Sequence, residues 1–579
     1  MDYRKVYQEW LDNPYFDDVT KAELIAIKGD EKEIQERFYR DLEFGTGGLR
    51  GILGAGTNRM NIYTVRKATQ GLANFIKQEG SEAMKKGVAI AYDSRRMSPE
   101  FTDEAALVLA ANGIKTYVFE SLRPTPVLSF AVRSLGCVAG IVVTASHNPP
   151  EYNGYKVYWE DGAQVTSPKD ELIIGEVQKV ASYDEVYTMD KVAALSQGLY
   201  VIIDKHIDVD YLNALKKLVI DQEAINSVSD DFKIVYTPLH GTGLIPVTDI
   251  LAQIGFKHVS VVAEQAEPDG NFPTVSYPNP EDIKAFELAI AVGKKEDADI
   301  ILATDPDADR LGVMAKDSNG EYVSLTGNMI GILLLDYIVS RKQATGTLPS
   351  NAAVVSTIVS TNMAVPVAAH YGIELFEVLT GFKYIGEKIK EFERSGSNTY
   401  LFGFEESYGA LVGTHARDKD AVVASMSVCE MAAFYKTQGM TLYEGLLALY
   451  EKYGYYKETL NSITLAGMAG VEKITHILTT LRTEGLATVN DVKVTQMRDY
   501  ETGIITNFAT GEKTATGLPL SNVLYFTLED DSWLCMRPSG TEPKVKFYFG
   551  VKGSSLADAD TKLTDFSEAV MVKINDIIG

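Results

Sequence analysis

The sequence predicts three successive α/β domains with mixed, mostly parallel sheets around a shared cleft, followed by a C-terminal α+β domain. The chain has 579 residues, which is enough for three to five domains at roughly 100–200 residues each. Along most of it, short β-branched runs bounded by Gly, Pro or Asp end in polar loops, with helical patterns between them. The last part of the chain instead has the pattern of an antiparallel meander followed by a helix. These observations place the α+β domain at the end.

Five apolar runs have the pattern of buried parallel strands that lead into polar loops. They are Val88–Tyr92, Gly140–Val143, Lys233–Tyr236, Asp299–Ala303 and Thr399–Phe402. Segments such as Glu104–Asn112 and Glu281–Lys294 have helical patterns and supply the crossovers. Since ligands of open α/β sheets bind beyond the carboxyl ends of the strands, we expect the polar loops to face one cleft.

Charged, helix-prone stretches near Gln197–Asp210, Asp317–Glu321 and Lys452–Asn461 suggest the domain boundaries. We therefore expect domains over residues 1–205, 206–318, 319–458 and 459–579. In the last of these, the runs Val523–Leu528, Ser532–Met536 and Val545–Val551 predict the meander.

The charge balance limits the partners of the protein. Lys plus Arg total 55 against 79 Asp plus Glu, so the net charge is −24 and nucleic acid and anionic lipid would be repelled.

The three cysteines are far apart in the sequence, which argues against a disulfide framework or a zinc site. The first ten residues lack a signal-peptide apolar core, and the most apolar stretch, Met329–Val339, is too short to span a bilayer. We expect a soluble, cytoplasmic protein with no nucleic-acid or membrane partner.

Asp305, Asp307 and Asp309 follow the fourth apolar run and form a candidate metal site. Alternate residues of an extended segment point the same way, so the three carboxylates would converge. Oxygen-only ligands with open positions suit Mg²⁺ that also binds a phosphoryl oxygen. An EF-hand loop is excluded because Arg310 and Lys316 stand where it needs Gly and Glu. A solvated acidic loop is the alternative, and the apolar run before the loop weighs against it.

Three further loops have residue types suited to chemistry. Ser146 and His147 lie in a turn rich in Asn, Pro and Gly, and by themselves such residues are more often turn formers than a nucleophile and its base. Residues 537–544 combine Arg, Lys, two hydroxyls and a glycine, and predict a phosphate cradle or, equally well, a basic hairpin turn. Residues 45–51 are Gly-rich but match neither common nucleotide-binding pattern, so ATP and NAD have no support. His240 and His415 lack a second ligand at metal spacing, and we expect them to pack within loops.

Four motifs taken together, in this order, resemble the α-D-phosphohexomutase superfamily. They are TASHNP at 144–149, DPDADR at 305–310, GFEESYG at 403–409 and RPSGTEPK at 537–544. They look like its phosphoserine, metal-binding, sugar-binding and phosphate-binding loops, and the match runs from Gly45 to about Val551. Within the superfamily the chain is similar to the phosphoglucomutase branch, which also includes phosphopentomutases and glucose 1,6-bisphosphate synthases. Phe404 before the paired glutamates departs from the usual glucose-preferring loop.

The resemblance implies a phosphoryl-transferring mutase that acts on sugar phosphates. Ser146 would be a phosphoserine that converts glucose 1-phosphate and glucose 6-phosphate into one another through glucose 1,6-bisphosphate. Mg²⁺ would be held by Asp305, Asp307, Asp309 and a phosphoryl oxygen on Ser146. His147 and Lys419 are the candidates for proton transfer.

The resemblance also assigns functions to the domains and to further residues. In chain order the four domains would carry the phosphoserine, the metal, the sugar and the phosphate-binding loop. Expected substrate contacts are Arg50, Arg310, Lys383, Glu405, Ser407, Arg537, Ser539, Gly540, Thr541 and Lys544, with Arg95 as a further active-site contact. A phosphopentomutase or phosphomannomutase on the same scaffold is the alternative enzyme. The D-x-D pattern at 305–307 would also suit a phosphohydrolase with an aspartyl nucleophile, although three alternating aspartates fit metal ligation better. A sugar-phosphate-binding protein without catalytic activity is the remaining alternative.

Overall fold

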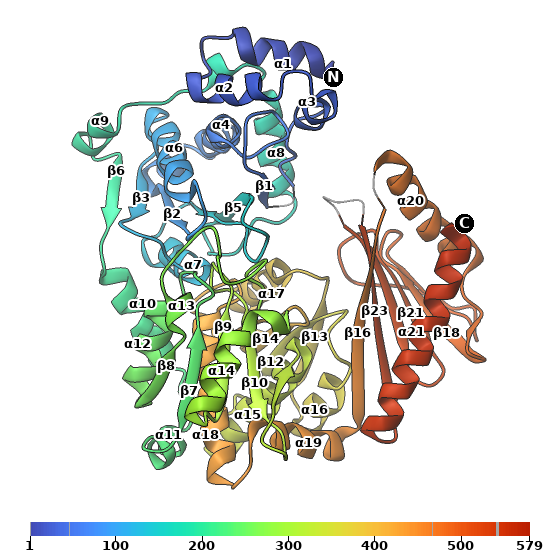
Figure 1. Cartoon of the computed structure of the whole chain (residues 1–579). Helices are drawn as coiled ribbons and strands as arrows, with labels where there is room; N and C mark the ends of the chain where they lie inside the picture. The colour runs from blue at the N-terminus through green and yellow to red at the C-terminus, as the bar shows by residue number, and fades with distance from the viewer. Residues whose placement is uncertain (1, 46, 466, 540–543, 579) are drawn as a thin grey trace. The chain divides into compact units, whose positions relative to one another are not determined.

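The computed structural model describes residues 2–45, 47–465, 467–539 and 544–578 (Figure 1). The chain divides into two compact units. The first unit comprises Met1–Ala352 and Phe382–Tyr443, and the second comprises Ala353–Gly381 and Glu444–Gly579. Within the described residues, no helix is both long enough and apolar enough to cross a membrane.

The first sheet of the first unit has six strands in the order β1-β5-β4-β2-β3-β6. Their bounds are β1 Gly48–Ile52, β2 Val88–Tyr92, β3 Thr116–Phe119, β4 Ala139–Val143, β5 Tyr152–Trp159 and β6 Tyr200–Ile203. Strands β4, β2, β3 and β6 are parallel to one another, whereas β5 is antiparallel to both β4 and β1. The sheet is therefore mixed and mostly parallel, as predicted.

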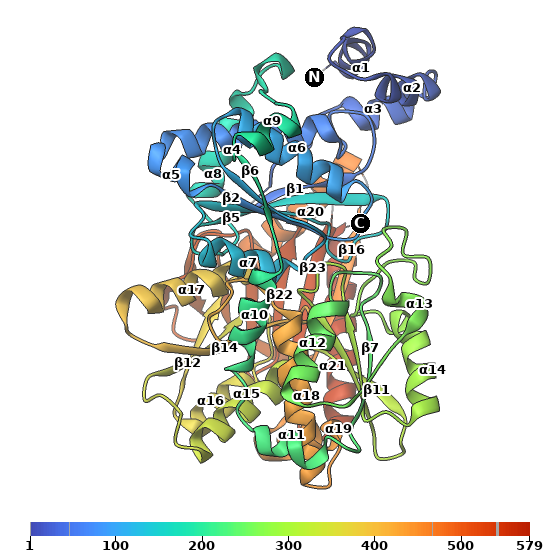
Figure 2. The same ribbon diagram turned by 90° about the vertical axis from the view of Figure 1, so that its left-hand side faces the viewer.

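Helices cover both faces of this sheet. Figure 2 shows α4 (Ile62–Gln78), α6 (Ser98–Ala111) and α8 (Lys169–Lys179) on one face and α7 (Thr125–Ser134) on the other. The short helices α5 (Ser81–Lys86) and α9 (Lys191–Ser196) complete this part. Helix α7 approaches closely because Gly140 has no side chain: a Cβ there would lie 2.5 Å from Val132 Cγ2.

The second sheet has five strands in the order β11-β10-β9-β7-β8. Their bounds are β7 Lys233–Thr237, β8 His258–Val261, β9 Ile300–Thr304, β10 Leu311–Lys316 and β11 Tyr322–Leu325. Helices α10 (His206–Lys216), α11 (Gln222–Val228), α12 (Leu244–Ile254), α13 (Ala263–Ala266) and α14 (Glu287–Glu296) belong to the same segment. Strand β9 is parallel to β7 but antiparallel to β10. The aspartate loop therefore connects the two strands of a hairpin.

The remaining part of the first unit contains a second hairpin, packed against helices. Strand β14 (Thr399–Glu405) pairs antiparallel with β15 (Gly409–Val412), next to helices α15 (Gly327–Ala344), α17 (Phe382–Ser395) and α18 (Ala421–Thr437). Helix α18 is buried almost all round and starts at Asp420, whose side chain accepts from the N–H groups of Val422 and Val423. A helix without a polar face has to lie inside the protein.

Three N-terminal helices form an aromatic cluster that the sequence did not predict. They are α1 (Tyr3–Asp12), α2 (Asp18–Ala26) and α3 (Glu31–Phe38), and an aspartate side chain caps the start of each. Trp10 stacks on Phe16 with ring centroids 4.1 Å apart, and Phe16 meets Tyr63 of α4 edge to face at 4.8 Å. These contacts attach the three helices to the first sheet's layer of helices.

The second unit contains an antiparallel sheet in the order β16-β23-β22-β21-β18-β19-β20, with β17 paired to β18. The bounds are β16 Tyr455–Thr464, β17 Thr488–Val489, β18 Val492–Asp499, β19 Ile504–Asn507, β20 Lys513–Ala515, β21 Leu524–Leu528, β22 Trp533–Pro538 and β23 Lys544–Gly553. Helices α20 (Gly467–Glu484) and α21 (Leu556–Ile578) pack against it (Figure 1). The parallel strands β12 (Ala352–Thr357) and β13 (Glu374–Val378), with α16 (Ala364–Tyr371) and α19 (Leu442–Tyr453), lie almost entirely in the same unit. The predicted α+β C-terminal part is confirmed.

Two of the stretches interpreted as helix-prone contain strands. Tyr200–Ile203 is β6, paired with β3, and Tyr455–Thr464 is β16, paired with β23 over ten positions. Pairing with a long neighbouring strand outweighs the local helix propensity of this charged stretch. The helix before it ends where Gly454 takes a φ of 113°.

Candidate functional site

Ser146 lies in the loop that joins β4 to the antiparallel β5. Its φ is 51°, in the left-handed region, and its N–H donates to Thr144 Oγ1 at 2.8 Å. The side chain is only 4% exposed, and its Oγ donates to Asp305 Oδ2 at 2.7 Å. The same Oγ is 3.2 Å from His147 Nδ1. The loop therefore brings this hydroxyl to the aspartates of the second sheet and to an imidazole at once.

Arg95 holds the loop around Ser146 in place. Its guanidinium donates to the backbone carbonyls of Ser146, Asn148 and Pro149 in this loop and of Tyr152 at the start of β5. Asp93 accepts from Thr144 Oγ1 at 2.6 Å and from the Arg95 N–H at 2.9 Å. A planar donor fork against several carbonyls fixes loop geometry, so Arg95 acts on the loop itself.

The three aspartates converge, but not in the way we expected. Residues 305–309 form a turn rather than an extended segment, and Ala308 has a φ of 49°. The N–H groups of Asp309 and Arg310 donate to Asp305 Oδ1 at 3.1 Å each. One carboxylate oxygen from each aspartate lies within 4.8 Å of the others. The turn, not strand alternation, gathers the oxygens.

Two lysines and a threonine flank this cluster. Lys156 Nζ is 2.9 Å from Asp307 Oδ2, and Lys419 Nζ is 3.1 Å from Asp309 Oδ2. Thr125 Oγ1 donates to Asp307 Oδ2 at 2.9 Å. Asp307 Oδ1 and Asp309 Oδ1 are buried and have no hydrogen-bond partner in the part of the chain that the structure describes. Buried acceptors without donors are costly, and a hard cation such as Mg²⁺ would satisfy both.

The pKa values of Asp305 and Asp307 are shifted in opposite directions. Burial raises the pKa of Asp305 well above its usual range, and the charges of Asp307 and Asp309 raise it further. Burial would also raise the pKa of Asp307, but the Lys156 ammonium and hydrogen bonds lower it below its usual value. Three buried carboxylates therefore repel one another, which a divalent cation would relieve.

The two candidates for proton transfer differ in charge. Burial holds the pKa of His147 well below its usual range, and the nearby Arg310 and Arg50 add to that effect. His147 is therefore neutral at pH 7 and can accept a proton. Burial would lower the pKa of Lys419, but Asp309 and Asp418 raise it above its usual value, so its amine stays protonated.

The loop of the second hairpin reaches the same cluster. Glu405 ends β14, is 4% exposed and accepts from Ser407 Oγ at 2.8 Å. Arg310 Nη1 donates to the Ser407 carbonyl at 3.0 Å and to Glu281 Oε1 at 2.6 Å. A Cβ on Gly409 would lie 2.2 Å from Lys419 Cδ, so the absence of a side chain at this glycine leaves room for the Lys419 side chain. The metal loop, the sugar loop and Lys419 thus form one assembly.

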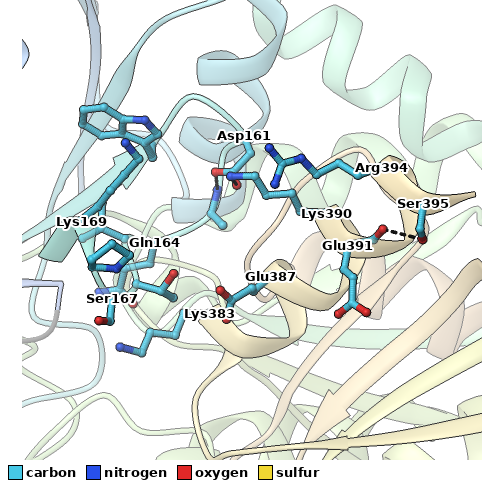
Figure 3. Close-up of a pocket in the computed structure, with 15 residues that line it drawn as sticks. Asp161, Gln164, Ser167, Lys169, Lys383, Glu387, Lys390, Glu391, Arg394 and Ser395 are labelled. Atoms are coloured by element: carbon cyan, nitrogen blue, oxygen red, sulfur yellow. Dashed lines mark hydrogen bonds and ion pairs between the residues drawn. The ribbon is translucent and has the colours of Figure 1, made fainter. Parts of the chain in front are cut away.

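The remaining expected substrate contacts are carried by other segments of the chain. Arg50 Nη1 donates to Asn148 Oδ1 of the Ser146 loop at 3.2 Å. Lys383 lines a hollow of about 680 Å³ whose lining includes neither Ser146 nor the aspartates (Figure 3). In the second unit, Arg537 lies near the end of β22, and the Ser539 N–H donates to the Lys544 carbonyl at 2.7 Å. Gly540 and Thr541 lie outside the described residues.

The two loop histidines are held within loops. His240 Nε2 is 2.9 Å from Thr274 Oγ1, and its Nδ1 is 3.1 Å from the Glu267 carbonyl. His415 Nε2 is 2.6 Å from Asp420 Oδ2. Both make the packing contacts that we expected of them.

Comparison with known proteins matches the chain to family models and to relatives along most of its length. Residues 41–184, 209–320 and 326–453 match, in order, the models for α/β/α domains I, II and III of phosphoglucomutase/phosphomannomutase. The phosphoglucomutase of Staphylococcus epidermidis is 37% identical over 550 residues, which cover 94% of this chain and 95% of that protein. The phosphoglucomutase of Staphylococcus aureus is 36% identical over 532 residues, covering 92% and 93%.

Solved structures show the same fold. The phosphoglucomutase parafusin from Paramecium, in an open form, has a TM-score of 0.66 at 19% identity and covers 93% of this chain and 95% of its own. A phosphoglucomutase/phosphomannomutase family protein from Burkholderia thailandensis has a TM-score of 0.62 at 20% identity, covering 92% and 97%.

Proposed function

The chain belongs to the α-D-phosphohexomutase superfamily and is a mutase of the phosphoglucomutase type, and we propose that its substrates are α-D-glucose 1-phosphate and glucose 6-phosphate. Ser146 carries the phosphoryl group, and glucose 1,6-bisphosphate is the intermediate. The observation that carries the proposal is the 2.7 Å hydrogen bond from Ser146 Oγ to Asp305. It places a hydroxyl nucleophile in contact with a cluster suited to a divalent cation.

Asp305, Asp307 and Asp309 would hold the Mg²⁺ ion. The two buried carboxylate oxygens without a donor, on Asp307 and Asp309, support this assignment. When bound, the ion neutralises negative charge on the transferring phosphoryl group.

The side chains around Ser146 have separate roles in the proposed reaction. When Ser146 Oγ attacks a sugar phosphate, the O–P bond to Ser146 forms, the bond to the sugar oxygen breaks, and the neutral His147 Nδ1 at 3.2 Å accepts the hydroxyl proton. In the reverse transfer the same proton returns to Ser146. The protonated Lys419, fixed between Asp309 and Asp418, donates a proton or a hydrogen bond to the sugar oxygen. Arg95 keeps the loop in position throughout.

Glu405 and Ser407 set the sugar preference in this proposal. Their mutual hydrogen bond fixes a carboxylate that can accept from ring hydroxyls, and the paired glutamates of this loop favour glucose. We expect Glu405→Gln to lower kcat/KM for glucose 1-phosphate by about 10- to 100-fold, since a charge-assisted hydrogen bond is worth about 1.5–3 kcal/mol. The matched control is Glu100→Gln on the exposed start of α6, which should leave kcat/KM unchanged. Unaltered kinetics of Glu405→Gln would remove Glu405 from the sugar site.

A coupled assay across glucose, mannose and deoxyribose 1-phosphates tests the assigned substrate. Glucose 1-phosphate should have the highest kcat/KM, because a site built to pair a hydroxyl rejects a sugar in which it is absent or misplaced. Equal values for glucose and mannose would contradict the assignment, and a preference for deoxyribose 1-phosphate would make the protein a phosphopentomutase. Net release of inorganic phosphate would favour the phosphohydrolase, and no conversion of any sugar would favour a binding protein.

The loop that follows β22 is proposed to bind the phosphate that is not transferred. Arg537, Ser539, Gly540, Thr541 and Lys544 grip phosphate oxygens and ignore the sugar. Arg537→Ala should therefore raise KM for glucose 1-phosphate and glucose 6-phosphate by similar factors, about 10- to 100-fold, in steady-state kinetics in both directions. Lys513→Ala, on the exposed strand β20 of the same unit, is the control for loss of one positive charge. A defect confined to one monophosphate would show that the loop is only a structural turn.

A further inference from the structure

Strand β5 contacts two separate parts of the proposed active site. Lys156 and Tyr158 are two positions apart on this strand, so their side chains lie on the same face of the sheet. Lys156 Nζ is 2.9 Å from Asp307 Oδ2. Tyr158 is fully buried and donates its hydroxyl to Asp418 Oδ2 at 2.6 Å. One strand therefore contacts both the aspartate cluster and the loop that follows β15.

Asp418 connects Tyr158 to Lys419. Its Oδ1 accepts from the Lys419 backbone N–H at 2.8 Å and from Lys419 Nζ at 3.2 Å. Its Oδ2 accepts from the Tyr158 hydroxyl. Because the tyrosine bonds one carboxylate oxygen and the lysine the other, the carboxylate cannot turn without losing a hydrogen bond. The Tyr158 hydroxyl thereby fixes the anion that holds the Lys419 ammonium.

The Lys419 ammonium needs this second anion because another ammonium lies close by. Lys419 Nζ is 3.1 Å from Asp309 Oδ2, and Lys156 Nζ is 3.7 Å from the same oxygen. Two positive charges next to one carboxylate repel each other. The carboxylate of Asp418, on the loop of Lys419 itself, offsets that repulsion and keeps Lys419 beside Asp309.

The ionisation states of Tyr158 and Asp418 suit their hydrogen bond. Burial raises the pKa of Tyr158 well above its usual range, so its hydroxyl remains a donor. Burial would also raise the pKa of Asp418, but the Lys419 and Lys156 ammonium groups hold it below its usual value. A hydrogen bond from a neutral hydroxyl to a carboxylate is charge-assisted and stronger than one between neutral groups.

We propose that Tyr158 is a positioning residue for phosphoryl transfer, which acts through Asp418 to hold the Lys419 ammonium at the sugar oxygen. This inference rests on the proposed mutase function, in which Lys419 donates to that oxygen. Tyr158 is fully buried and does not touch the substrate. Loss of its hydroxyl should therefore slow the transfer and leave binding of the sugar phosphate unchanged.

Steady-state kinetics of Tyr158→Phe with glucose 1-phosphate test the proposal. We expect kcat to fall by about 10- to 100-fold, the scale of one hydrogen bond to a charged group. KM should stay within about twofold of the wild-type value, because the lost interaction acts in the transition state. Should this variant fail to fold, Asp418→Asn, which keeps the size of the side chain and removes its charge, is expected to give the same split between kcat and KM.

The matched control is Tyr155→Phe, on the same strand. Tyr155 is also fully buried, and its hydroxyl accepts from Thr69 Oγ1 at 3.1 Å. Its odd position places it on the opposite face of the sheet from Tyr158. The control therefore removes one buried, hydrogen-bonded tyrosine hydroxyl without touching Asp418, and its kcat should equal that of the wild type. Thermal unfolding of both variants measures the structural cost of each hydroxyl.

A double-mutant cycle shows whether Tyr158 acts through Lys419. Lys419→Met should lower kcat by itself, and Tyr158→Phe added to it should lower kcat by less than about twofold more. A general loosening of the structure would instead lower kcat in both backgrounds by the same factor.

Four results would overturn the proposal. Unchanged kcat of Tyr158→Phe in an active wild-type background would remove the positioning role and leave the mutase function intact. An equal loss of kcat in Tyr155→Phe, or full additivity with Lys419→Met, would make Tyr158 a structural residue. Absence of turnover in the wild type would overturn the proposed function, and the positioning role with it.

Discussion

Ser146→Ala is expected to lower kcat by about 10⁴-fold or more, the scale of nucleophile deletions in enzymes that form covalent intermediates. The hydroxyl is the only atom of that side chain that can carry a phosphoryl group, and it lies 2.7 Å from Asp305. Alanine keeps the backbone and the Arg95 contacts, which go to carbonyls. The coupled mutase assay in both directions measures the loss.

The matched control is Ser134→Ala, which removes an exposed hydroxyl at the end of α7 and should leave kcat unchanged. Unfolding temperatures of both variants should stay close to that of the wild type. Turnover of Ser146→Ala at the wild-type rate would mean that the phosphoryl group is carried elsewhere.

Asp307→Asn is expected to lower kcat by about 10³-fold, the upper scale for loss of one electrostatic contact to a transition state. The substitution keeps the size of the side chain but removes a charge from the oxygen set that would hold Mg²⁺. It also leaves Lys156, 2.9 Å away, without its closest anion. Activity measured against Mg²⁺ concentration should show a raised requirement for the ion together with a lower maximum.

The control is Asp103→Asn, which breaks a half-exposed ion pair with Lys191 outside the cluster and should change neither quantity. Full activity of the wild type in EDTA would contradict the metal assignment, whatever the behaviour of Asp307→Asn.

The sequence was most informative where chemistry is concentrated in one short segment. The aspartate loop, the Ser146 loop and the Glu405 loop each follow an apolar run, and all three come together in the first unit. Each loop lies at the carboxyl end of its strand, where ligands of open α/β sheets bind, although the three strands β4, β9 and β14 belong to different sheets. The detailed backbone of the aspartate loop did not follow, because a turn with one left-handed residue is set by hydrogen bonds to Asp305 rather than by strand periodicity.

Residues that act across long sequence distances were not identified from the sequence. Lys156 reaches Asp307, 151 positions later, and nothing in its own segment distinguishes it from a surface lysine. Its position on the strand paired with β4 could have been a signal, because that strand returns next to the Ser146 loop. Strand β16 was missed for the same reason, since its pairing with β23 is long-range.

The account of proton transfer also depends on the structure. His147 and Lys419 were both candidates by resemblance, but burial next to arginines lowers the pKa of His147, whereas Asp309 and Asp418 raise that of Lys419. Desolvation lowers the pKa of both groups. The charges of the neighbouring side chains decide whether the pKa ends below or above its usual value.

Transfer of phosphate through Ser146 is the central claim, and a single-turnover experiment tests it most directly. The protein is incubated with glucose 1,6-bisphosphate and Mg²⁺, freed of ligand, mapped by peptide mass, and then mixed with glucose 1-phosphate and quenched. The account predicts one phosphoryl group on the peptide that contains Ser146, and its quantitative transfer to glucose 1-phosphate to give glucose 1,6-bisphosphate. An unmodified Ser146 peptide, or release of the phosphoryl group as inorganic phosphate, would contradict it.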